Sequence, residues 1–325
     1  MIIDCHAHLV PPELLAAIRN DAARFPSVRQ IEDGGSVAFA FAGGKPTRPV
    51  SKALSDMPAR LTWMAKQGID RQVIGGWVDM FGYELPGDEA EAWSRLANDC
   101  LLAASKADSH FVPLATVPLS DGARAASVLK TAMAAGFPGA MIGTLPRGVG
   151  STLDHADLDP FWQAADETGA IIHIHPSFDA GDVRVNDFGL ANGLGRITDA
   201  VVAVARLICA GHVAKYNNAR IFAPMGAAAL PFVLGRLKRN AQITPGIGDP
   251  VEGLARIYTD TILHDSRVLR FVVEIMGTDR LMMGSDMPFP IGDTEPMKIV
   301  TDAGLPKAQT ESINGGLAVR LFRIR

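Results

Sequence analysis

Short apolar runs alternate along this chain with longer segments in which apolar residues recur every three or four positions. The longer segments predict helices, for example over 89–107, 122–136 and 197–216. The short runs predict eight strands, at 1–7, 71–77, 111–117, 139–144, 170–175, 219–224, 256–261 and 280–286. Eight strands alternating with helices favour an α/β fold of the (β/α)8 TIM-barrel type. A doubly wound sheet is the alternative, but no glycine fingerprint opens a strand–helix turn.

Two segments interrupt this alternation. Residues 9–58 hold Gly-Gly pairs between alternating apolar residues, which predicts a small β-hairpin inserted after the first strand. Residues 177–198 form a glycine-rich loop after the fifth strand. We therefore expect one barrel domain over 1–325, with an insertion at about 9–58.

Composition narrows the possible functions. Hydrophobic residues make up 48% of the chain and charged residues 20%, which describes a soluble globular protein with a large core. A net charge of −4 and 6% aromatic residues give little support to nucleic-acid binding. The opening "MIIDCHAHLV" lacks the basic region of a signal peptide, and no apolar stretch could span a bilayer. Three widely spaced cysteines argue against a disulfide framework, so we expect a cytoplasmic protein.

Histidines and an aspartate stand at the ends of three predicted strands. His6 and His8 lie two apart in the first strand, so both can point to the same side, at the strand end where barrel active sites form. His175 ends the fifth strand and Asp286 ends the last. Imidazole and carboxylate groups that converge in this way are typical of a metal site. His173 shares the face of His175 one layer deeper, where a core histidine with a backbone hydrogen bond is the simpler interpretation.

Longer motifs resemble a known family. They are "DCHAHLVP" at the start, "GFPGAMIGT" at 136–144, "IHPSF" at 174–178, "AAALPFVLGRL" at 227–237, "IYTDTILHD" at 257–265 and "DRLMMGSDMPFPIGDTEP" at 279–296. The chain is identified on these motifs as a member of the amidohydrolase-2 family, close to aminocarboxymuconate-semialdehyde decarboxylase and its relatives. The resemblance implies a barrel with a small β-insertion. It also implies one divalent metal, usually zinc, with manganese and cobalt as alternatives, held by His6, His8, His175 and Asp286.

One position departs from the family pattern. Relatives carry a histidine after the sixth strand, where it serves as an acid/base, but this chain has Met225 in "PMGAAALP". A thioether carries no proton, and losing a positioned acid/base costs about 10²–10⁴ in rate. Asp286 remains available to accept a proton. His264 either takes over the role of the missing histidine or only supports the site. Ala227 and Ala228 also replace two family glycines, which adds methyl groups where a ligand would approach.

The resemblance also suggests residues that would bind a substrate carboxylate and a partner subunit. Arg60 and Arg236 match arginines that hold carboxylates in some relatives, and the helix that carries Arg236 implies a homodimer. Trp77 ends the second strand, where it would either line the pocket or pack against the rim. Met225 is expected to contact the substrate. Arg239, one turn from Arg236, is equally well explained as a solvent-facing residue.

Three functions fit this pattern. The first is a metal-dependent decarboxylase, a carbon–carbon lyase, acting on a small carboxylated compound from aromatic breakdown. The second is a hydrolase or hydratase on the same scaffold. The third is a catalytically silent ligand-binding protein, which Met225 favours and the four intact ligands oppose. The sequence does not identify the substrate, because loops set it.

Overall fold

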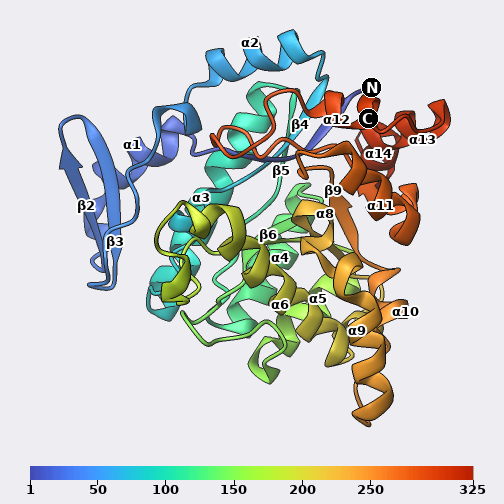
Figure 1. Cartoon of the computed structure of the whole chain (residues 1–325). Helices are drawn as coiled ribbons and strands as arrows, with labels where there is room; N and C mark the ends of the chain where they lie inside the picture. Colours follow the sequence, from blue (N-terminus) through green and yellow to red (C-terminus); the bar gives the residue numbers. More distant parts are fainter. Residues whose placement is uncertain (325) are drawn as a thin grey trace.

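The computed structural model describes residues 1–324 (Figure 1). Eight parallel strands form its centre. One sheet holds β1 (Ile3–His8), β4 (Arg71–Gly75) and β5 (Phe111–Pro113), and the other holds β6 (Gly139–Gly143), β7 (Ile171–His175), β8 (Arg220–Ala223), β9 (Tyr258–Asp260) and β10 (Leu281–Met282). Parallel bridges join the edges of the two sheets on both sides, Ala115 with Ala140 and Ala7 with Met287. The strands thus form the (β/α)8 barrel that the sequence predicts.

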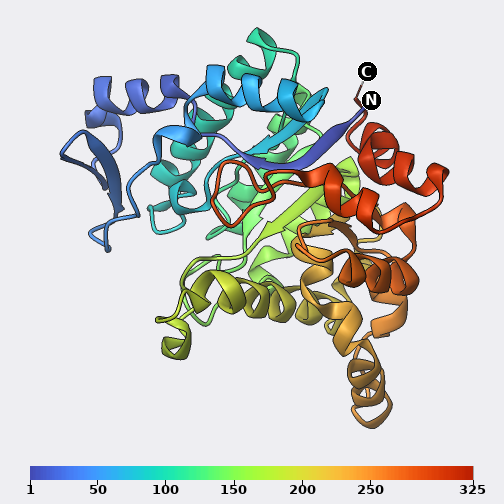
Figure 2. The ribbon, with the colours of Figure 1, turned by 45° about the horizontal axis from the view of Figure 1, so that its top comes forward.

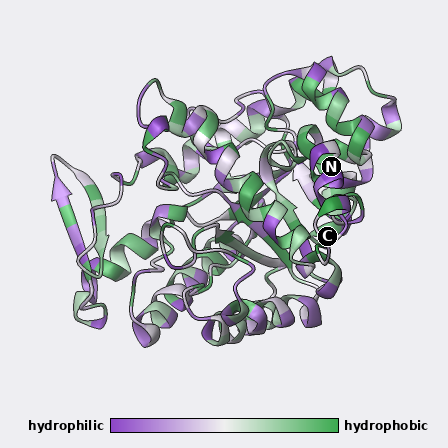
Figure 3. Cartoon of the chain, turned by 60° about the horizontal axis from the view of Figure 1, so that its bottom comes forward, coloured by the Kyte–Doolittle hydropathy of each residue, from purple (hydrophilic) through white to green (hydrophobic). Residues whose placement is uncertain are grey.

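Alternate residues of these strands point into the ring and out of it. Buried inward side chains such as Val73, Met141 and Phe222 share one cluster, while their neighbours Ile74 and Ile142 pack against the surrounding helices. Both faces are therefore buried, which explains why the strands appear in the sequence as short continuous apolar runs. Figure 3 shows hydrophobic residues along the central strands and mixed hydropathy on the helices around them.

Helices surround the strands (Figure 2). The predicted segment 197–216 is two helices, because Gly211 adopts a left-handed φ of 77° between them. In the described residues, no helix is long and apolar enough to cross a membrane. The helices are α1 (Pro12–Asn20), α2 (Met57–Gln67), α3 (Gly87–Ala107), α4 (Gly122–Ala135), α5 (Asp159–Thr168), α6 (Arg196–Cys209), α7 (His212–Lys215), α8 (Pro224–Ala228), α9 (Leu230–Ile243), α10 (Pro250–Leu254), α11 (Ser266–Met276), α12 (Pro296–Asp302), α13 (Lys307–Glu311) and α14 (Leu317–Leu321).

The insertion after β1 contains the expected hairpin. Strands β2 (Val28–Asp33) and β3 (Ser36–Phe41) pair antiparallel through a two-residue turn, Gly34–Gly35, in which both φ angles are positive. Such a turn suits glycine, because both central residues are left-handed. The hairpin projects from one side of the barrel (Figure 1), and the ring of Phe41 packs 5.3 Å from that of Trp93 on α3.

Candidate metal centre and cavity

Four side chains converge at the carboxyl ends of three barrel strands. His6 and His8 come from β1, His175 is the last residue of β7, and Asp286 follows β10. One ligand atom from each lies within 4.8 Å of every other, which matches a metal-binding group. The structure therefore brings together the four residues expected as ligands, although they are 280 positions apart in the chain at their extremes.

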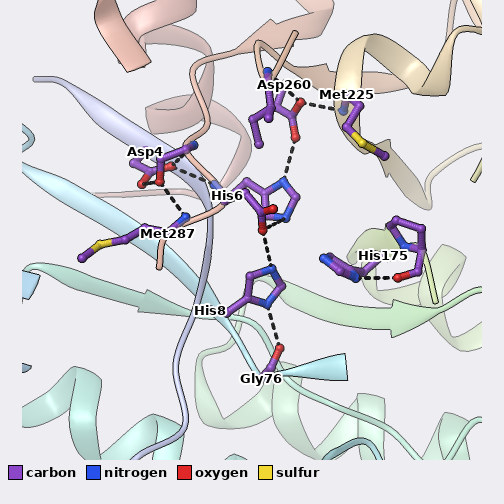
Figure 4. A network of polar contacts seen from close by, with 12 residues as sticks. Asp4, His6, His8, Gly76, His175, Met225, Asp260 and Met287 are labelled. Atoms are coloured by element: carbon purple, nitrogen blue, oxygen red, sulfur yellow. Dashed lines mark hydrogen bonds and ion pairs between the residues drawn. The ribbon is translucent and has the colours of Figure 1, made fainter. Parts of the chain in front are cut away.

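The outer nitrogen of each imidazole is held by a fixed acceptor (Figure 4). Nδ1 of His8 lies 3.0 Å from the Gly76 carbonyl, and Nδ1 of His175 lies 3.0 Å from the Pro176 carbonyl. A carbonyl only accepts, so each Nδ1 carries the proton and each Nε2 presents a lone pair. Nδ1 of His6 lies 2.8 Å from Oδ2 of Asp260, a carboxylate–histidine pair of the kind that orients metal ligands.

The atoms that face the centre lack partners. Nε2 of His6, Nε2 of His8 and Oδ1 of Asp286 are buried and make no hydrogen bond within residues 1–324. Oδ1 of Asp286 lies 3.1 Å from Nε2 of His8 and 3.6 Å from Nε2 of His6. Buried polar atoms are normally satisfied, so this arrangement fits a bound cation. Three imidazoles and one carboxylate suit zinc, manganese or cobalt.

Burial and neighbouring charge move the ligands' pKa values in different directions. Burial lowers the pKa of His8, and it lowers the pKa of His175 well below its usual value, which favours the neutral imidazole that binds metal. Burial also acts to lower the pKa of His6, but the Asp260 hydrogen bond and nearby carboxylates outweigh it and raise that pKa. Burial opposes ionisation of Asp286, yet the His8 contact and nearby positive charge lower its pKa, so this group is a carboxylate.

A buried polar network supports the ligands from below. Asp4 accepts a hydrogen bond from the backbone N–H of Ser285 at 2.9 Å and one from Nε2 of Gln72 at 2.8 Å. Arg60 donates to Oε1 of Gln72 at 2.7 Å and to the His8 carbonyl. Arg60 is fully buried and does not line the cavity, so the structure does not support the expected contact with a substrate carboxylate. Its guanidinium instead positions β1.

His173 lies beneath the ligands, as expected, but it lacks the expected backbone hydrogen bond. It is fully buried, and neither ring nitrogen has a hydrogen-bond partner among residues 1–324. Its ring packs against Phe222 at a centroid distance of 4.2 Å and edge-on to His6 at 4.4 Å. The prediction of a backbone bond is wrong because aromatic neighbours occupy the space around the ring.

Met225 belongs to a strained turn after β8. Its φ is 55°, and residues 226–229 also have positive φ values, between 49° and 62°. Three of those four are alanines, for which a left-handed conformation is unfavourable. The turn directs the Met225 N–H to Oδ1 of Asp260 at 2.7 Å. Ala227 and Ala228 are fully buried and lie outside the cavity lining, so their methyl groups do not occupy ligand space as expected.

A cavity of about 630 Å³ opens above the ligands. His6, His175 and Asp286 form its floor, and Met225 and exposed His264 lie on its wall. Most of the remaining surface is apolar and comes from α9, α11 and the adjoining loops, with Phe232, Val268, Phe271 and Ile291 among the contributors. Its size and largely apolar surface suit a small organic ligand with a few polar groups.

Two other expected substrate contacts lie away from this cavity. Arg236 is exposed on α9 and does not line the cavity. Trp77 is buried, with Cζ of Arg48 5.3 Å from its ring centroid, and does not line the cavity either. Two residues that sequence reasoning missed are close to the ligands instead. Asp260 ends β9 and holds His6, and Arg196 begins α6 and lines the cavity. The aspartate in "YTDT" at a strand end was a usable signal, whereas Arg196 lies in a loop-to-helix region with no pattern.

Known proteins resemble this chain over its full length. Residues 3–324 match the family model described as Amidohydrolase. The 2-amino-3-carboxymuconate-6-semialdehyde decarboxylase of Dictyostelium discoideum is 25% identical over 339 residues, covering 98% of this chain and 91% of that protein. The solved 5-carboxyvanillate decarboxylase of Sphingomonas paucimobilis has a TM-score of 0.83 at 21% identity, covering 100% and 99% of the two chains.

A further solved structure was obtained with a metal and a small acid. It is the 5-carboxyvanillate decarboxylase of Novosphingobium aromaticivorans, complexed with manganese and 4-hydroxy-3-methoxy-5-nitrobenzoic acid. Its TM-score is 0.80 at 20% identity, covering 99% of this chain and 96% of that one. At these identities, the structural similarity demonstrates a shared fold.

Proposed function

Because the chain belongs to the amidohydrolase family, we propose that it is a metal-dependent decarboxylase acting on a small carboxylated aromatic or ring-cleavage compound. The observation that carries the proposal is the convergence of unpartnered His6, His8 and Asp286 atoms beneath an apolar cavity. The Dictyostelium relative, a decarboxylase by name, supports a lyase over a hydrolase.

His6, His8, His175 and Asp286 would hold one divalent cation. Zinc is our first expectation from the ligand types, and the manganese in the Novosphingobium structure makes Mn²⁺ the main alternative. Such an ion would supply positive charge that holds a substrate carboxylate or hydroxyl and stabilises developing negative charge.

The chain's own residues would handle the proton. When the bond to the leaving carboxylate breaks, its electron pair stays on the substrate carbon and must take up a proton. His264 is exposed on the cavity wall and can donate one, while Asp286, held as a carboxylate, can accept one from a substrate hydroxyl. Met225 cannot do either, and its place on the wall favours packing against the apolar part of the substrate.

We further propose that the protein is a homodimer. The apolar rim of the cavity is open, with Phe232 82% exposed and Ile291 43% exposed. Arg236 lies one turn from Phe232 on α9, which projects from the barrel (Figure 2). A second copy packed on α9 would cover this rim and bring Arg236 near the partner's cavity. Light scattering of the purified protein measures the mass of the assembly.

The proposed compartment is the cytoplasm. Cys5, Cys100 and Cys209 are all free in the structure, and Cys5 is buried. Unpaired thiols suit a reducing compartment.

Metal content and carbon dioxide release test the function together. We expect about one equivalent of divalent metal in the purified protein, lost in a His175→Ala variant. The metal-loaded protein should release CO2 from at least one member of a panel of aromatic and muconate-type acids. Metal binding without CO2 release, but with hydrolysis or hydration of a panel member, would replace the lyase with the second function. No metal uptake would leave only a silent ligand-binding protein.

A further inference from the structure

Arg196 is a buried cation without a partner at the edge of the cavity. It is 7% exposed, begins α6 and lines the cavity together with His6, His175 and Asp286. Within residues 1–324, its guanidinium makes no hydrogen bond or ion pair, and Nε is fully enclosed. Burying a charge without a counterion is unfavourable, because the protein does not replace the water that the charge loses. An anionic group of a bound ligand would neutralise this guanidinium.

Nearby carboxylates are already engaged. Asp199 lies one helical turn from Arg196, but its Oδ2 accepts the Ser177 N–H at 2.8 Å and the Thr144 hydroxyl. Asp79 forms a two-bond pair with Arg48, each bond 2.9 Å long. Asp286 belongs to the metal-ligand group. None of these carboxylates forms an ion pair with Arg196.

Phe178 separates a neutralised arginine from an unpaired one. Its ring centroid lies 4.2 Å from Cζ of Arg48 and 5.2 Å from Cζ of Arg196. These contacts hold both guanidinium planes in place, so less motion is lost when a ligand binds. Arg48 is neutralised by its ion pair with Asp79, whereas Arg196 has no carboxylate partner and is free to bind an anionic ligand.

We propose that Arg196 binds a second acidic group of the substrate, separate from the group held at the His6–His8–His175–Asp286 centre. The substrate is then a compound with two acidic groups on one ring or short chain, such as a dicarboxylate. This inference rests on the proposed function only in taking the cavity as the substrate site. A guanidinium that meets a carboxylate through two parallel hydrogen bonds gives the geometric selectivity that this role needs.

Binding of two simple aromatic acids tests the proposal. Isophthalate carries two carboxylates on one ring and benzoate carries one. Calorimetry on the metal-loaded protein should show at least 10-fold tighter binding of isophthalate than of benzoate. Arg196→Gln should remove this preference and leave benzoate affinity within about 3-fold, because only the second carboxylate loses its partner. Arg196→Lys, which keeps the charge but loses the planar fork, should retain part of the preference.

Arg267→Gln is the matched control. Arg267 also lines the cavity, but its side chain is 80% exposed and it pairs with Asp265 at 2.6 Å. This variant should keep the isophthalate preference of the wild type. A further readout separates ligand binding from a structural role: removing an unpaired buried cation should raise the melting temperature of ligand-free Arg196→Gln, and Arg196→Met should do the same.

Three results would overturn the proposal. The first is equal binding of the two acids by the wild type, which includes no binding of either. The second is an unchanged preference in Arg196→Gln. The third is a lower melting temperature in both charge-removing variants. The proposed lyase activity fails separately, because these measurements need no turnover. If isophthalate binds through Arg196 but no acid on the panel releases CO2, the second acidic subsite stands and the decarboxylase does not.

Discussion

Each imidazole of the proposed metal centre is oriented by the group that accepts a hydrogen bond from its Nδ1. Two of these acceptors are backbone carbonyls, which no substitution removes, but the third is a side chain. Asp260 accepts from His6 through Oδ2, while its Oδ1 accepts the Met225 N–H at 2.7 Å and the Ile262 N–H at 3.2 Å. One carboxylate therefore orients His6, a proposed metal ligand, and anchors the turn that carries Met225.

Replacing Asp260 with asparagine should weaken metal binding about 10–100-fold. An amide has one accepting oxygen, so it cannot receive both the His6 proton and the Met225 N–H as the carboxylate does. Competition with a chromogenic chelator measures the change in affinity. Asp265→Asn removes a cavity carboxylate that pairs with Arg267, and it should leave metal affinity unchanged. Equal losses in the two variants would mean that overall charge, and not His6 orientation, controls binding.

Substitutions at Met225 and at His264 should affect kcat very differently. Met225→Leu keeps an apolar side chain of similar size, so kcat should change less than about 3-fold. His264→Gln removes the proposed proton donor on the cavity wall and should lower kcat by about 10² or more. Single-turnover kinetics on an accepted substrate would compare the two. A Met225→Leu loss as large as that of His264→Gln would show that the thioether itself is needed.

At the scale of elements, the turn after β8, residues 225–229, keeps a strained left-handed backbone next to the site. Ala229, at φ 62°, is exposed and is the last of five consecutive left-handed residues. A left-handed alanine costs about 1–2 kcal/mol that glycine avoids. The hydrogen bonds of this turn to Asp260 and Thr259 explain why the conformation persists.

Ala229→Gly should therefore stabilise the protein by about 0.5 kcal/mol, after the extra freedom of glycine in the unfolded chain is subtracted. The matched control is Ala103→Gly at an exposed site within right-handed α3, where glycine should destabilise by about 1 kcal/mol. Denaturant unfolding of both variants measures the difference. A destabilised Ala229→Gly would contradict the proposed strain.

How much could be predicted from the sequence also differs between elements. The strands and the four ligands were predictable, because strand ends meet at one barrel mouth whatever the loops do. Arg60 was expected to bind a substrate carboxylate, but it projects inward from α2 and donates to the His8 carbonyl. The spacing of residues along a helix does not show which buried group a side chain will contact. Arg196 lies where a π-helical turn, Ala191–Gly195, runs into α6, and tertiary contacts such as that with Phe178 help to place it. The sequence pattern alone therefore did not predict that it lines the cavity.

For the whole molecule, several buried titratable groups lie in the barrel interior. Asp4, His6, His8, His173 and His175 are all buried within the ring or at its mouth. The proposed metal ligands among them would change protonation together with metal binding. His173 is different, because it lies outside the ligand set and burial lowers its pKa well below the ordinary value. Its effect on stability can be separated from that of the metal.

Folding stability should fall as the pH drops below about 6.5, the pKa of an unperturbed histidine. The unfolded chain then binds a proton at His173 that the folded protein does not, so the free energy of unfolding decreases by up to about 1.4 kcal/mol per pH unit from this group. His173→Phe removes the group while keeping an aromatic ring against Phe222. Its stability should depend less steeply on pH between 6.5 and 5, by close to one proton.

Urea unfolding at several pH values in this range measures the two slopes directly. His155→Phe, which removes an exposed imidazole, should keep the slope of the wild type. The three histidines of the proposed metal centre are unchanged in both variants, so the comparison reports on the imidazole that each variant removes. Identical slopes for His173→Phe and the wild type would mean that His173 takes up its proton inside the folded barrel, which would contradict the expected lowering of its pKa by burial.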